Sequence, residues 1–127
     1  MNLKIVFRIG AVINAINGLG LLFVTQAFME QAGFEITPPL LTIGQGMGVT
    51  FIFLAIICWR IPDISGNSLK SFGQLFVIGH LLFLLIIGYH IMTGQAGGPP
   101  AYGNLVINAI LAILFFVYSR DTKEISE

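Results

Sequence analysis

Four long apolar stretches follow one another along the 127-residue chain, separated by short segments rich in polar residues, glycine or proline. A helix that crosses a bilayer needs about 20 apolar residues, and each stretch has roughly that length. The pattern predicts spanning helices over roughly 5–28, 39–59, 72–92 and 100–118. The expected fold is therefore all-α, a single domain (1–127) that forms a transmembrane four-helix bundle.

Residues that favour helix ends stand at the predicted boundaries. Thr37 can cap the second span, with Pro38 at its first helical position, and Ser68 can cap the third. Pro62 is expected to follow the end of the second span, and Pro100 to lie in the first turn of the fourth. The residues that favour helix ends thus lie where the hydropathy pattern predicts the ends of the spans.

Charged side chains are confined to the ends of the apolar stretches. None lies within 9–29 or 71–119, and Glu35 is the only one within 31–59. A charge at the centre of a bilayer costs about 2.5 kcal/mol or more, which explains this distribution. The chain is 56% hydrophobic and 9% charged, with a mean hydropathy of +0.90, whereas a soluble domain carries about 25% charged residues. A soluble protein is excluded.

The basic residues predict the orientation in the membrane. All six lie at one side of the predicted spans, before the first, between the second and third, or after the fourth, namely Lys4, Arg8, Arg60, Lys70, Arg120 and Lys123. The two connections on the other side contain none. By the positive-inside rule, both termini are expected in the cytoplasm. Asp63 is then a candidate partner for Arg8 at the cytoplasmic side.

The segment between the first two spans is expected on the outer side. It contains Glu30 and Glu35 together with apolar residues such as Phe34, so it should lie along the membrane interface. A solvated loop is the preferred interpretation of its two carboxylates, and attraction of a cation is the alternative.

Several classes of chemistry have no basis in this sequence. A formal net charge of zero and the lack of a basic run argue against a nucleic-acid partner. The single cysteine, Cys58, excludes an intramolecular disulfide and a CxxC motif. No Ser-His-Asp set, carboxylate pair or phosphate-binding glycine loop is found. No catalytic residue and no metal ligand is therefore predicted, and a non-enzymatic role is favoured.

Small residues recur where helices are expected to meet. Gly10 and Gly18 lie eight residues apart on the first span, and Gly44 and Gly48 form a GxxxG pattern on the second. Helices in lipid associate through close packing and a few polar contacts. These glycines are predicted to pack helices within the chain, with dimerisation as the alternative.

Polar side chains are expected near mid-depth on every span. Asn14 and Asn17 lie on the first, Thr50 on the second, His80 on the third and Asn108 on the fourth. Such groups turn inward in hydrocarbon and find hydrogen-bond partners. One interpretation is a layer that fixes helix register, in which His80 bonds an amide or hydroxyl. The other is a binding site for a small polar ligand, a quinone carbonyl or a proton relay.

A short repetition accompanies this layer. The sequence Val-Ile-Asn-Ala-Ile occurs at 12–16 and again at 106–110, which places Asn14 and Asn108 in equivalent positions. It arises either by chance or because the first and last helices each present an asparagine to the bundle.

The two histidines do not form a bis-histidine haem site. His80 and His90 are ten residues apart on one predicted helix, or about 15 Å along its axis. They cannot be the two axial ligands of one haem, so haem is not expected. His90 follows Tyr89 and is interpreted as an interfacial residue.

The sequence 7–11 (Phe-Arg-Ile-Gly-Ala), followed by Asn17-Gly18, together with four spans and cytoplasmic termini, resembles the DoxX-like family of small bacterial membrane proteins. The resemblance implies a protein of the bacterial cytoplasmic membrane that accompanies membrane redox systems or lies close to quinones.

Three functions are compatible with these observations. The first is a non-catalytic accessory or assembly subunit, in a homo-oligomer or a larger membrane complex. The second is a protein that binds a quinone, a lipid or another small ligand at the mid-membrane polar layer. The third is an oligomeric channel or transporter. Membrane lipids are expected partners in each case.

Overall fold

The computed structural model describes residues 1–120, and Lys123, one of the six basic residues, lies outside this range. Helices account for all the regular structure of the described part, which confirms the all-α prediction. In chain order they are α1 (Leu3–Phe23), α2 (Thr25–Gln31), α3 (Pro38–Ile64), the short 3-10 helix η1 (Gly66–Ser68), α4 (Leu69–Met92) and α5 (Gly98–Ser119). Four of them, α1, α3, α4 and α5, are long and apolar enough to span a membrane.

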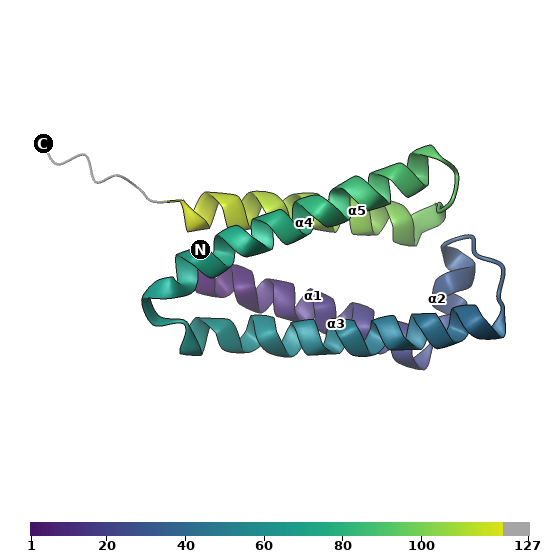
Figure 1. The fold of residues 1–127 in the computed structure, drawn as a ribbon, viewed down its shortest axis with the longest axis horizontal. Coiled ribbons are helices and arrows are strands. Elements are labelled where there is room, and N and C mark those ends of the chain that lie inside the picture. Colours follow the sequence, from purple (N-terminus) through teal and green to yellow (C-terminus); the bar gives the residue numbers. More distant parts are fainter. Residues whose placement is uncertain (121–127) are drawn as a thin grey trace, which may run out of the picture.

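The four long helices form two pairs. α1 packs along α3, and α4 packs along α5, while contacts between the pairs are fewer (Figure 1). The N-terminus, the α3–α4 connection and the end of α5 lie at the same end of the molecule, which we call the termini end. At the opposite end the pairs are farther apart, and α2 lies between them.

The first apolar stretch is not one helix, as predicted, but two. α1 ends at Phe23, Val24 leaves the helical region with φ −126° and ψ 38°, and α2 begins at Thr25. The break is compensated locally, because the Thr25 hydroxyl donates to the Leu21 carbonyl at 2.6 Å. The expected interfacial segment therefore includes a short helix that turns away from α1 (Figure 1).

α3 is longer than predicted at its C-terminal end. It continues through Pro62 to Ile64. A proline within a helix removes one backbone donor, here the one opposite the Cys58 carbonyl, but the next bonds form, as from the Ser65 N–H to the Ile61 carbonyl at 3.0 Å. At the other end, Thr37 caps the helix as predicted, since its hydroxyl accepts from the Leu40 N–H at 3.4 Å.

The ends of α4 and α5 follow the sequence prediction more closely. Ser68 occupies the N-cap position of α4, although its side chain makes no capping hydrogen bond. Pro100 lies in the first turn of α5, as predicted.

Glycines set the close approach of α1 and α3. A Cβ atom added to Gly48 would lie 2.8 Å from the Leu22 nitrogen and 2.9 Å from the Gly18 oxygen, both backbone atoms. One added to Gly44 would lie 2.7 Å from the methyl group of Thr25. The prediction that the Gly44/Gly48 face packs against another helix is confirmed, and the contact is made within the chain.

An aromatic core joins the two pairs at the termini end. The Phe7 ring contacts Phe76 and Phe115 edge-on, with centroids 5.1 and 4.9 Å apart, an arrangement that stabilises by about 0.5–1.5 kcal/mol per pair. Gly10 also faces this core, but an added Cβ would lie 3.8 Å from Phe115, which is ordinary contact. The buried cluster comprises Leu3, Val6, Phe7, Ile61, Leu111 and Phe115.

An ion pair links α1 to α3 at the same end. The Arg8 Nη2 atom lies 2.8 Å from the Asp63 Oδ1 atom, which confirms the predicted partner. The guanidinium also donates to the Trp59 carbonyl and lies over the Trp59 ring, 4.2 Å from its centroid. Arg8 therefore pairs its charge with Asp63 and makes two hydrogen bonds inside the chain.

A cavity between the helix pairs as candidate functional site

A cavity of about 390 Å³ lies between the two helix pairs, in the half of the molecule away from the termini. All four long helices and α2 contribute to its lining. Most lining side chains are aliphatic or aromatic, and the polar ones are Asn14, Asn17, His80, His90, Asn104 and Asn108. This combination of an apolar wall with a few convergent polar groups is typical of small-molecule sites.

Packing closes the cavity at both ends. Toward the termini end lies the aromatic core, whose Phe115 ring stacks on His80 with the centroids 5.5 Å apart and the planes 18° apart. At the other end, α2 and the segment after it form a cap with Phe28 and Phe34 in the lining. The cap is joined to the start of α5 by a hydrogen bond from the Gly97 N–H to the Ala32 carbonyl at 3.3 Å.

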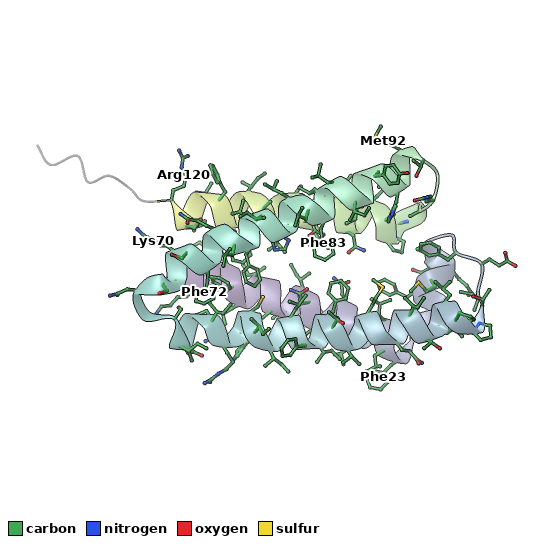
Figure 2. The ribbon with its side chains drawn as sticks, in the orientation of Figure 1. Phe23, Lys70, Phe72, Phe83, Met92 and Arg120 are labelled. Atoms are coloured by element: carbon green, nitrogen blue, oxygen red, sulfur yellow. The ribbon has the colours of Figure 1, made fainter. Side chains whose placement is uncertain are left out.

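The side of the cavity between α3 and α4 is the least covered. These two neighbours make little contact with each other. Lining side chains on both helices are substantially exposed, with values of 60% for Ile43 and 46% for Ile86. Phe51 and Phe83 meet across this side with ring centroids 6.4 Å apart, and Figure 2 shows Phe83 pointing from α4 toward α3. Since the helices are long and apolar enough to span a membrane, we expect this side to face lipid.

A chain of hydrogen bonds joins α4 to α5 at the cavity wall. The Asn108 Nδ2 atom donates to the Asn104 carbonyl at 2.8 Å, and Asn108 Oδ1 lies 2.8 Å from His80 Nδ1. The hydrogen bond predicted between His80 and a polar side chain at mid-depth is therefore present, with Asn108 as the partner. His80 itself is only partly buried, because it lines the cavity.

The two asparagines of the repeated sequence occupy similar settings. Asn14 donates to the Gly10 carbonyl at 2.9 Å, as Asn108 does to the carbonyl four residues before it, and both line the cavity. Asn17 also lines the cavity, one turn farther along α1. The first and last long helices thus each present an asparagine to the interior, as the symmetric interpretation of the repeat expects.

Thr50 does not belong to this set. It is exposed on the outer side of α3, and its hydroxyl donates to the Gly46 carbonyl of the same helix at 3.1 Å. The interpretation that every span turns one polar group inward is therefore wrong for α3, where a hydroxyl satisfied by its own helix has no need of an interior partner. The cavity-lining side chains of α3 are apolar.

Two polar lining residues were not predicted as part of the site. Asn104 lies one helical turn before Asn108, and that four-residue spacing is the signal that could have identified it. His90, interpreted from the sequence as interfacial, is partly buried and lines the cavity near the capped end. Its distance from His80 along α4 keeps the two imidazoles from acting on one atom.

The two carboxylates between α1 and α3 lie outside the cavity lining. Glu30 is exposed and accepts a hydrogen bond from the Gln26 side chain at 2.8 Å, and Glu35 is exposed in the connection to α3. Both are placed as the solvated-loop interpretation expects.

The fold and the cavity together define a helical protein of the multi-pass membrane class with an internal, largely apolar site. No protein-family model matches the chain, and neither a curated protein nor a solved structure was found to be similar to it. The membership implied by the DoxX-like resemblance therefore stays a prediction. The cavity and its polar groups are the basis for assigning a function.

Proposed function

We propose that this protein binds an amphiphilic small molecule dissolved in the membrane, a quinone-like or lipid-like compound, in the cavity between its two helix pairs. The observation that carries the proposal is the convergence of His80, Asn14, Asn17, Asn104 and Asn108 on one apolar space of about 390 Å³. Ligand pockets in proteins usually measure about 300–1,000 Å³, so the cavity is large enough for a headgroup with part of its chain.

The position of the polar groups supports this ligand class. His80 and the four asparagines line one part of the cavity, whereas the wall toward α3 and, apart from His90, the wall toward the capped end are apolar. A molecule with a polar head and an apolar tail matches this gradient. The resemblance to DoxX-like proteins, with its expected proximity to quinones, favours the same class.

The packing argues for ligand binding over the two other functions. The small-residue face at Gly44 and Gly48, which could have held a partner protein, is occupied by α1 and α2 of the same chain. A channel or transporter needs a path across the membrane, whereas the aromatic core around Phe7 and Phe115 fills the bundle at the termini end. An assembly subunit stays the main alternative, and its test is whether a partner copurifies.

The orientation belongs to the same proposal. Lys4, Arg8, Arg60, Lys70 and Arg120 lie at or near the termini end, so we place that end in the cytoplasm of a bacterial cell. The cavity then lies in the outer half of the membrane, and its open side faces the outer leaflet.

The experiment compares ligand retention in three forms of the protein. Each is extracted from membranes with a mild detergent and analysed by native mass spectrometry, which detects copurified small molecules and partner proteins together. Met47→Trp fills the open side of the cavity from α3, and Val49→Trp places the same side chain at an exposed position of α3 outside the lining.

We expect wild type and Val49→Trp to retain an amphiphilic ligand, and Met47→Trp to lose it at an unchanged melting temperature. Equal retention in both variants would place the ligand outside the cavity. Absence of any ligand, with a partner protein retained instead, would favour the assembly role.

A further inference from the structure

The hydrogen bonds around His80 determine which of its ring nitrogens carries the proton. Asn108 Nδ2 donates to the Asn104 carbonyl, so the atom that Asn108 turns toward His80 is its oxygen, an acceptor. Only a protonated Nδ1 can complete that 2.8 Å contact. A neutral imidazole has one N–H, and therefore the other nitrogen, Nε2, is a bare acceptor.

Nε2 has no hydrogen-bond partner within the described part of the chain, and His80 lines the cavity. Within residues 1–120 the ring makes one side-chain hydrogen bond, through Nδ1 to Asn108, and Nε2 is not enclosed by protein. Stacking on Phe115 holds the ring plane in place. Asn17 and Asn104 line the same cavity, and their amides supply both donors and acceptors.

The lining also restricts the charge of a ligand. Within the described part of the chain, none of the residues that line the cavity is Lys, Arg, Asp or Glu. An ionised headgroup would lose its hydration without gaining an opposite charge, which is strongly unfavourable in a bilayer. Phospholipid and fatty-acid headgroups therefore do not fit, whereas a neutral headgroup does.

From these observations we infer that the ligand is an uncharged membrane molecule with a hydroxyl headgroup, which donates its hydrogen bond to His80 Nε2. The inference rests on the proposed function and makes it more specific. The apolar part of the ligand lies toward the capped end and reaches the lipid through the open side between α3 and α4, beside Phe51 and Phe83. A ketone or ether oxygen at the same place would face the Nε2 lone pair and be repelled.

Two sources of this chemistry are an isoprenoid alcohol and a reduced quinone, and matched probes separate them. Farnesol is compared with farnesyl methyl ether, which keeps the chain but has no donor, and with farnesoic acid, which is ionised. Decylubiquinol is compared with decylubiquinone. Affinities are measured by ligand titration in nanodiscs with native mass spectrometry.

We expect at least one hydroxyl probe to bind roughly fivefold more tightly than its donor-free counterpart, since one hydrogen bond contributes about 1 kcal/mol. Farnesoic acid should bind more weakly than farnesol. A preference for farnesol identifies the alcohol as the source, and a preference for decylubiquinol identifies the quinol.

Substitution at His80 tests the acceptor itself. The amide nitrogen of an asparagine lies near the position of the histidine Nδ1, so His80→Asn can keep the bond to Asn108 while it removes Nε2. This variant should fold and bind farnesol and its ether equally. Thr50→Val, at a lipid-facing position of similar depth, is the control and should keep the wild-type preference.

Nitrogen-15 NMR of labelled histidine gives a second readout. The His80 signals, assigned by their loss in His80→Asn, should show a protonated Nδ1 and an unprotonated Nε2 that shifts when the alcohol binds. A proton on Nε2, or equal binding of every hydroxyl probe and its donor-free counterpart, would overturn the inference while leaving cavity binding intact. Failure of all probes to bind, with no ligand retained from membranes, would reject the proposed function as well.

Discussion

Thr50 and Asn108 show how the number of hydrogen-bond donors and acceptors on a side chain decides which way it faces in lipid. Both donate to the carbonyl four residues earlier on their own helices, Gly46 and Asn104 respectively. For the threonine hydroxyl this one bond uses its only hydrogen. The asparagine amide still has an acceptor and a second donor, so it turns inward to His80. The sequence could predict which polar side chains lie at mid-depth. Whether such a side chain faces the interior or the lipid depends on which of its donors and acceptors stay without a partner after it has bonded to its own helix.

Gly48 is the residue at which a single methyl group should have the largest effect on packing. In Gly48→Ala the new Cβ would lie within 3 Å of two backbone atoms of α1, which can give way only if the helices separate. Overpacking of this kind costs about 1–3 kcal/mol. We expect the free energy of unfolding, measured by titration with a denaturing detergent in mixed micelles, to fall by that amount.

Gly46→Ala is the matched control for this substitution. It lies two residues away in the same glycine-rich run, but an added Cβ meets nothing within 4 Å. Its stability should equal or exceed that of wild type, because alanine favours helix more than glycine. An equal decrease in the free energy of unfolding in both variants would show that these glycines affect stability through the flexibility of α3 and not through contact with α1.

At the scale of the elements, the sequence predicted the long helices well and the short one not at all. Runs without charge located α3, α4 and α5 to within a few residues, apart from the extension of α3 through Pro62 to Ile64. The break at Val24 had no signal in hydropathy, because 9–29 is continuously free of charge. It depends on tertiary contacts instead, as Phe28 folds back against Gly20 and the Thr25 hydroxyl replaces a helical donor.

The cap formed by α2 depends on a glycine at the start of α5. Gly98 has φ +72°, and an added Cβ would meet the Gln31 carbonyl oxygen. Gly98→Ala is therefore expected to cost about 1–3 kcal/mol of strain and to loosen the contact between α2 and α5. Hydrogen exchange of the backbone amides in 25–34, measured by mass spectrometry in detergent, should become faster.

Gly97→Ala controls for the loss of a glycine in the same turn. Gly97 has an extended backbone with φ −156°, an added Cβ has no neighbour within 4 Å, and its N–H to the Ala32 carbonyl is kept. Exchange in 25–34 should stay at the wild-type rate. If both variants exchange alike, the cap is held by its apolar side chains and not by the close approach at Gly98.

For the whole molecule, the cavity arises from the way in which the helix pairs diverge. The aromatic core joins them at the termini end, and α2 fills part of the space at the other end (Figure 1). Hydropathy could predict that Asn14, Asn17, His80 and Asn108 share a depth, but not which helices pair. The pairing of α1 with α3 places these residues around a space instead of in a closed layer, and so favours a binding role over a purely structural one.

The arrangement of charge over the whole molecule leads to the last prediction, which concerns orientation. Figure 2 places Lys70 and Arg120 at the termini end and Met92 at the other. With Lys4, Arg8 and Arg60 also at or near the termini end, that end is expected in the cytoplasm, because basic residues are retained there during insertion.

Single cysteines in a Cys58→Ala background, in which the buried native thiol is removed, test this orientation. Asn67→Cys lies in the α3–α4 connection and Gln95→Cys in the α4–α5 connection, both at exposed positions. A membrane-impermeant maleimide added to intact cells should label Gln95→Cys, and should label Asn67→Cys only after permeabilisation. The reverse labelling pattern would show that the protein has the opposite orientation in the membrane. The open side of the cavity would then face the inner leaflet, and its ligand would have to be sought among the molecules of that leaflet.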